Sequence, residues 1–148
     1  MPRPVPRFAF AALCAVVLAS GLALGSAAAA EAPLPPNKVV IQVSDSDPAK
    51  WRLALNNARN VQTDLGAANV AIEIVAYGPG IGMLKADSAV AGGVDDAISS
   101  GVKVVACENT MHGQKLTNVD MLNKIGYVPA GVVELLQKQQ QGWAYIRP

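Results

Sequence analysis

The chain has 148 residues, two cysteines and a formal net charge of +1. Two of its twelve basic residues and none of its eleven acidic residues lie in the first thirty positions, so the remaining 118 residues carry a net charge of −1. This charge disfavours a nucleic-acid partner. A length of 118 residues is ordinary for one domain with a single core, so no second domain is expected.

The first thirty residues have the pattern of a secretory signal peptide. Two arginines precede an acid-free apolar run from Phe8 to Leu24, and small residues follow as far as Ala30. We expect cleavage after Ala30 and a periplasmic or secreted protein with no membrane anchor. Cys14 lies in the apolar run and is lost with it, so Cys107 is the only cysteine of the mature chain and no internal disulfide can form.

A strand and a helix are expected at the start of the mature chain. Residues 31–37 form a Pro-rich leader, and Lys38 to Val43 is a continuous apolar run typical of a strand that is covered on both faces. Aspartates just before Pro48 predict a helix start, because aspartate caps helices and proline suits the first turn. Apolar residues at helical spacing then continue to Gly66, which ends the helix.

The middle of the chain repeats this order. Val70 to Ala76 is rich in β-branched residues and is the second predicted strand, and the glycines that follow it indicate a turn. Residues 83–100 have a helical pattern, in which Gly92 and Gly93 favour two short helices over one. Val102 to Ala106 is the third predicted strand.

The last third contains two more strands. A polar stretch at 108–118, interpreted as a loop, precedes a short helix expected at Val119 to Lys124 and a brief strand at Tyr127 to Val128. A helix is predicted from Pro129 to Gln141, and Trp143 to Ile146 is the fifth strand. The apolar side of that last helix is expected to comprise Val132, Val133, Leu135 and Leu136.

Strands that alternate with helices require crossover connections. This order predicts an α/β fold over residues 38–148, with a mostly parallel sheet of about five strands and helices on both of its faces. The expected architecture is a three-layer α/β/α sandwich.

Cys107 is the leading candidate for chemistry because it follows a predicted strand directly. Ligands of open α/β sheets usually bind at the carboxyl ends of the strands. If a helix begins just after Cys107, its N–H groups and dipole favour the thiolate, which is the nucleophilic form. The alternative is an inert buried cysteine, since free cysteine is among the most buried residue types.

Polar neighbours could assist that thiol. His112, the only histidine, could raise the thiolate fraction or relay a proton, although a surface histidine without function is the simpler interpretation. Asn109 and Thr110 could donate hydrogen bonds to a thiolate or a bound sulfur anion, or cap the next helix.

The remaining motifs are weaker. The closely spaced Gly78 and Gly80 could help form a pocket, but they match neither nucleotide fingerprint, so a tight turn is favoured over phosphate binding. Asp45 and Asp47 could bind a cation beyond the first strand, but aspartate before a helix is ordinarily a cap. We therefore expect no metal site and no cofactor.

Three segments together resemble the DsrE/DsrF-like family. They are the A-C-x-N-T pattern at 106–110, the V-P-A-G-V piece at 128–132 and the A-Y-I-R-P ending at 144–148. The resemblance extends from about Lys38 to Pro148. It implies an α/β/α sandwich that forms homo-oligomers or mixed complexes, and in sulfur-relay members a cysteine after the third strand carries persulfide sulfur. Cys107 matches that cysteine.

The resemblance leads to one principal hypothesis and two alternatives. In the first, Cys107 accepts sulfur from a donor protein as a persulfide and passes it to an acceptor, with backbone donors near Glu108 and Asn109 supporting the anion. In the second, the protein is a non-enzymatic oligomer in which Cys107 lines a small-ligand pocket. In the third, Cys107 is a redox-sensing thiol that forms an intermolecular disulfide.

Overall fold

The computed structural model describes residues 35–148. The expected signal peptide at 1–30 and residues 31–34 of the leader lie outside the described residues. Within 35–148, no helix is both long enough and apolar enough to cross a membrane.

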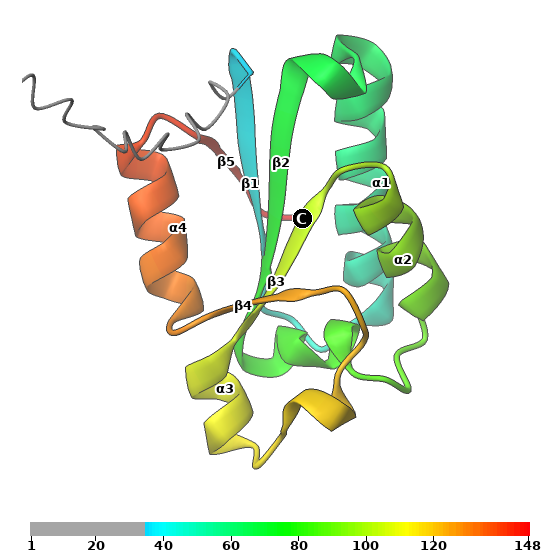
Figure 1. The fold of residues 1–148 in the computed structure, drawn as a ribbon, viewed down its shortest axis with the longest axis vertical. Helices are drawn as coiled ribbons and strands as arrows, with labels where there is room; N and C mark the ends of the chain where they lie inside the picture. Colours follow the sequence, from blue (N-terminus) through cyan, green and yellow to red (C-terminus); the bar gives the residue numbers. More distant parts are fainter. Residues whose placement is uncertain (1–34) are drawn as a thin grey trace, which may run out of the picture. The chain divides into compact units, whose positions relative to one another are not determined.

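A five-stranded sheet forms the centre of the domain (Figure 1). All its pairings are parallel, and the strand order is β4-β3-β2-β1-β5. The strands are β1 Asn37–Val43, β2 Val70–Ala76, β3 Lys103–Cys107, β4 Gly126–Val128 and β5 Ala144–Ile146. All five predicted strands are present, and the prediction of a mostly parallel sheet is confirmed by one that is wholly parallel.

Helices cover both faces of this sheet, as the three-layer prediction requires (Figure 1). The helices α1 and α2 pack on one face and α4 packs on the other, while α3 lies beyond the carboxyl end of β3. Their bounds are α1 Pro48–Leu65, α2 Ala91–Ser99, α3 Glu108–Gly113 and α4 Gly131–Gln140. Short 3-10 helices are η1 Ala67–Asn69, η2 Gly78–Leu84 and η3 Asn118–Asp120.

The helix α1 begins and ends where the sequence predicts. The N–H of Ala49 donates to Oδ1 of Asp47 at 2.8 Å, so Asp47 is a helix cap. Gly66 ends the helix with a φ of 84°, a conformation that glycine adopts without strain. Asp45 forms ion pairs with Lys50 and Arg147 instead of capping.

Four local predictions are wrong. Residues 83–100 contain one α-helix, α2, with Gly92 and Gly93 inside it, instead of two short helices. The first six residues of the polar stretch at 108–118 form the helix α3 and not a loop, because hydrogen bonds to Pro129 and from Gly78 hold them at the end of the strand. The helix expected at Val119 to Lys124 is only the 3-10 turn η3, which Thr117 and Asp120 close by capping each other. In α4, Leu135 is buried, but the other three apolar residues, Val132, Val133 and Leu136, are exposed.

Alternation along the strands creates two apolar cores. The larger lies beneath α1 and α2 and includes Ile41, Ile74 and Val104. The smaller lies beneath α4 and comprises Val40, Val75, Val105, Val128, Leu135 and Trp143. Since Val105 faces α4, the side chain of Cys107, two positions further along β3, also belongs to the α4 face.

The α4 face also contains a fully buried carboxylate. Oε2 of Glu73, in the middle of β2, lies 2.8 Å from Nζ of Lys138 and 3.1 Å from Nζ of Lys103. Oε1 of Glu73 has no N–H or O–H partner among the described residues. Glu134 lies beside Glu73, and its carboxyl can supply that donor when it is protonated. Two carboxyls and two lysines therefore form one connected group across the sheet.

Candidate functional site

Cys107 lies where the sequence predicts, at the carboxyl edge of the sheet. It is the last residue of β3, pairs with Val128 of β4 and is also the N-cap residue of α3. Its side chain is buried, with 5% of the residue exposed. The thiol is therefore held between a strand end and the starts of two helices, α3 and α4.

Two hydrogen bonds join the segments around this cysteine. The N–H of Asn109 donates to the carbonyl of Pro129 at 3.1 Å, which joins α3 to the segment before α4. The N–H of Gly78 donates to Oγ1 of Thr110 at 2.9 Å, which joins α3 to the turn after β2. Because Oγ1 of Thr110 accepts that bond, its own hydrogen remains available to the sulfur of Cys107.

The hydrogen bonds around Cys107 favour its thiolate. Burial raises the pKa of the thiol, but hydrogen bonds from the Thr110 hydroxyl and from the N–H groups of Gly131, Thr110 and Asn109 lower it by more. The net pKa of Cys107 lies below its ordinary value of 9.0. A lowered pKa increases the fraction of the reactive thiolate at neutral pH.

The N–H of Gly131 is a functional group that sequence reasoning did not assign. It lies at the first residue of α4, and that position depends on the absence of a side chain: a Cβ there would lie 2.9 Å from Cβ of Tyr77. The glycine thus lets α4 begin close to the end of β2. Only the strand order brings it to Cys107, since β4 lies beside β3 and neighbouring parallel strands bring the loops at their carboxyl ends together, so the local sequence carries no signal for it.

Some of the other predicted site residues lie beside Cys107 and others do not. Thr110 and Gly78 contact each other beside Cys107, and Asn109 contributes its backbone N–H. Glu108 is half-buried as the first residue of α3, and the donors to the thiol come from the residues after it. Gly80 packs against β1 instead, where a Cβ would lie 2.2 Å from the carbonyl oxygen of Val43. Gly80 therefore permits a close backbone contact that shapes the sheet edge.

His112 lies on α3 and is exposed. It is not among the groups that hydrogen-bond the thiol of Cys107. A role for His112 as a proton relay stays a prediction without a contact to support it.

No metal centre is evident in the part of the chain that the structure describes. Among residues 35–148, no three His, Cys, Asp or Glu side chains are grouped to hold a metal ion. Asp45 and Asp47, the pair considered for a cation, are occupied by ion pairs and by helix capping respectively.

Comparisons with known proteins agree with this architecture. The DsrE/DsrF-like family model matches residues 37–148. A solved protein of unknown function from Methanobacterium thermoautotrophicum is 36% identical with a TM-score of 0.72, and the match covers 76% of this chain and 99% of that one. No curated protein matches the chain.

Two further solved structures share the fold at lower identity. A conserved protein of unknown function from Bacteroides thetaiotaomicron is 15% identical, with a TM-score of 0.63 and coverage of 76% of this chain and 95% of that one. The ychN protein from E. coli is 12% identical, with a TM-score of 0.59 and coverage of 76% and 99%. The family match over the whole described domain and the relative at 36% identity agree, and the chain belongs to the DsrE/DsrF-like family.

Proposed function

We propose that this protein is a sulfur carrier that holds sulfane sulfur as a persulfide on Cys107. Membership of the DsrE/DsrF-like family suggests a function of the sulfur-relay type. The observation that carries the proposal is the position of the thiol at the end of β3, beside the Thr110 hydroxyl and the backbone N–H groups at the starts of α3 and α4, which lower its pKa. Donors that stabilise a thiolate also suit the terminal sulfur of a persulfide anion.

The proposed transfer balances without an added oxidant. The Cys107 thiolate attacks the outer sulfur of a donor persulfide, so a new S–S bond forms on Cys107 while the S–S bond of the donor breaks. The donor sulfur leaves as a thiolate with the electron pair. In the second step an acceptor thiolate attacks the outer sulfur, and Cys107 leaves as its thiolate. The protein ends in the state in which it began.

Burial of Cys107 favours this carrier over the redox-sensing alternative. An intermolecular disulfide requires two thiols to approach within bonding distance, and a side chain in a residue that is 5% exposed is poorly placed for that contact. In the proposed transfer the atom that contacts Cys107 is the outer sulfur of a persulfide, which extends about 2 Å beyond the cysteine sulfur that carries it, so donor and acceptor proteins need not approach as closely as a disulfide requires. Non-reducing electrophoresis tests the alternative, because a Cys107-dependent dimer would favour the sensor.

The direct test is intact-mass spectrometry after exposure to polysulfide. We expect a mass gain of one sulfur atom that disappears in Cys107→Ser and after treatment with a reductant. Alkylation by iodoacetamide as a function of pH should show a thiol with a pKa below that of free cysteine. The absence of any adduct, together with alkylation no faster than that of a free thiol, would contradict the carrier.

A hydroxyl variant tests whether the donors support the thiolate. Thr110→Val removes the hydroxyl that bonds both the thiol and Gly78, so the alkylation profile should move to higher pH. Thr63→Val on the exposed side of α1 is the matched control and should leave the profile unchanged.

We also propose that the chain assembles as a homo-oligomer through α4. Val132, Val133 and Leu136 expose apolar surface on this helix, and such clustered surface is typical of an interface. Trp143, by contrast, is buried in the core beneath α4. Leu136→Glu should reduce the mass found by light scattering, whereas Val119→Glu, at an isolated exposed valine of η3, should not. A monomeric unmodified protein would overturn this assembly.

We also propose that the protein is exported and that its signal peptide is removed. We expect the mature protein to begin at Glu31 in the periplasm or outside the cell, where it meets its sulfur donor and acceptor proteins. Cell fractionation and sequencing of the mature amino terminus test this location. An uncleaved protein in the cytoplasm would contradict it.

A further inference from the structure

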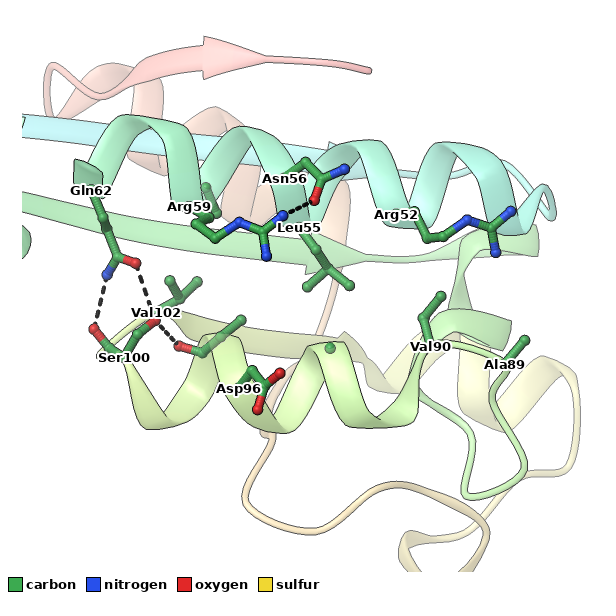
Figure 2. Close-up of a pocket in the computed structure, with 13 residues that line it drawn as sticks. Arg52, Leu55, Asn56, Arg59, Gln62, Ala89, Val90, Asp96, Ser100 and Val102 are labelled. Carbon is green, nitrogen blue, oxygen red and sulfur yellow. Dashed lines mark hydrogen bonds between the residues drawn. The ribbon is translucent and has the colours of Figure 1, made fainter. Parts of the chain in front are cut away.

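A groove of about 400 Å³ lies between α1 and α2, on the face of the sheet opposite to α4 and Cys107 (Figure 2). Sites for small molecules usually enclose about 300–1,000 Å³. The apolar lining comes from Leu55 and Ala58 of α1, Val90 just before α2, and Val102 just before β3. Its size and lining therefore suit an apolar ligand body.

Small residues on α2 and just before it keep this groove open. Ala89, Gly93 and Ala97 line it, and none of them has a side chain long enough to fill the space between the two helices. At Gly93, an added Cβ would lie 3.0 Å from Cδ1 of Leu55. The glycine thus marks a position at which a larger side chain would enter the groove.

The polar rim of the groove has an excess of positive charge. Arg52 and Arg59 lie seven residues apart, so they share one side of α1. Both are exposed, and neither has an ion-pair partner within residues 35–148. Arg59 donates only to Asn56, as Figure 2 shows. Asp96 on α2 is the one acidic lining residue.

One end of the groove is closed by hydrogen bonds. Nε2 of Gln62 donates to the carbonyl of Ser100 at 2.8 Å, and Oγ of Ser100 donates to Oε1 of Gln62 at 3.1 Å. Arg52 and Ala89 lie toward the other end in Figure 2. A ligand can therefore place a charged head beside Arg52 and extend an apolar chain past Leu55 toward the closed end.

We propose that this groove binds a carboxylic acid with a medium-length, unbranched apolar chain. The carboxylate would lie beside Arg52, whose planar guanidinium group suits two-point recognition of a carboxylate, while Arg59, about two turns further along α1, adds positive charge to the rim. The chain would cover Leu55 and Val102. A second copy of the protein fits this groove less well, because the rim is charged while α4 carries the clustered exposed apolar residues.

Titration calorimetry with octanoate tests the proposal on the whole protein. We expect saturable binding of one octanoate per chain, with amide NMR shifts confined to α1, α2 and the residues between β2 and α2. Octan-1-ol and octyltrimethylammonium keep the chain but change the head group, and they should bind at least about tenfold more weakly. Equal binding of all three probes would overturn the proposal, because it would indicate apolar partition alone.

Two neighbouring glycines provide a matched pair of variants. Gly93→Leu extends a side chain into the groove and should abolish octanoate binding. Gly92→Leu lies one position away in α2, where a Cβ has no neighbour within 4 Å, and should leave binding unchanged. Both substitutions raise helix propensity, so both variants should stay folded by circular dichroism. Unchanged binding in Gly93→Leu would place octanoate elsewhere and overturn the assignment.

Substitutions of the basic and the acidic residues of the rim should change the octanoate affinity in opposite directions. Arg52→Gln combined with Arg59→Gln should weaken octanoate about tenfold and leave octan-1-ol unaffected, while Asp96→Asn should tighten octanoate by removing a repulsive carboxylate. Cys107→Ser should bind octanoate as the unmodified protein does, which separates this site from the persulfide chemistry.

A change of oligomeric mass in Gly93→Leu, without any octanoate binding to the unmodified protein, would identify the groove as a contact between copies and overturn the ligand site.

Discussion

The two faces of the sheet are built for different tasks. Beneath α1 and α2, the strands present a large and almost wholly apolar core. Beneath the single helix α4, the core is smaller and shares its space with Glu73, Lys138 and the thiol of Cys107. The comparison indicates that one face supplies most of the hydrophobic stability, while the other accommodates charges and reactive groups close to a helix start.

The largest expected effect comes from the apolar face. Ile74 is fully buried beneath α1 and α2, and Ile74→Ala should lower the free energy of unfolding by about 4 kcal/mol because it removes apolar contacts and leaves a cavity. Val75, its neighbour on β2, faces α4, and Val75→Ala should cost about 2 kcal/mol. Urea unfolding measures both. Because Ile74→Ala removes three carbons and Val75→Ala two, equal losses per carbon removed would show that the two cores contribute alike and would remove the contrast between the faces.

The next largest losses of stability are expected for the lysines that pair with Glu73 on the α4 face. Lys138→Met removes the closest cation from the buried Glu73 and should cost about 3 kcal/mol, because a carboxylate is left partly uncompensated. Lys103 pairs with the same oxygen but is 58% exposed, so Lys103→Met should cost no more than about 1 kcal/mol. If the two variants lost equal stability, solvent exposure would not be the factor that separates the two ion pairs.

The same group predicts two opposite pH dependences. Burial raises the pKa of Glu73, but hydrogen bonds from Lys138, Glu134 and Lys103 and the charge of Lys103 bring it below 4.5. The unfolded state therefore binds more protons just below pH 4.5, and stability falls as the pH falls through the folded pKa. Burial and the neighbouring Glu73 raise the pKa of Glu134 above 4.5, so its contribution is lost as the pH rises through that folded pKa.

Urea unfolding between about pH 3 and pH 7 separates these contributions. Glu73→Gln should flatten the loss of stability on the acid side, whatever its effect on absolute stability. Glu134→Gln should remove the decline above pH 4.5 and leave the acid side in place. Identical pH profiles in the two variants would contradict the assignment of opposite shifts to the two carboxyls.

The sequence predicts the sheet well because each strand is a short apolar run bounded by caps or glycines. It fails where tertiary contacts decide the outcome. The stretch after Cys107 is polar, yet it becomes α3 because it continues from a buried strand and is held by Pro129 and Gly78. In α4, helical spacing alone does not reveal that Leu135 packs inward while Val132 and Leu136 stay exposed. That outcome depends on how one helix lies across the sheet.

The candidate site shows the same limit. Cys107 is predictable because a cysteine directly after a strand must lie at the sheet edge. The N–H of Gly131 is not predictable from local sequence, since its position depends on β4 lying beside β3 and on Tyr77 packing against a residue without a side chain. Glu73 is likewise hidden within an apolar run, and its burial depends on Lys138 of α4 and Lys103 of β3 lying beside its carboxylate.

The smallest effects are expected for a glycine-to-alanine substitution, made once in α2 and once in α4, on the two faces of the sheet. Gly92→Ala in α2 meets open space and should stabilise the protein by up to about 1 kcal/mol, because alanine favours a helix over glycine. Gly131→Ala in α4 forces Tyr77 away and moves the N–H from the thiol, so it should lower stability and raise the pKa of Cys107. Thermal unfolding and the pH profile of alkylation measure the two effects. If Gly131→Ala left the alkylation profile unchanged, the start of α4 would not be a source of thiolate stabilisation, and the donors of α3 alone would have to account for the lowered pKa.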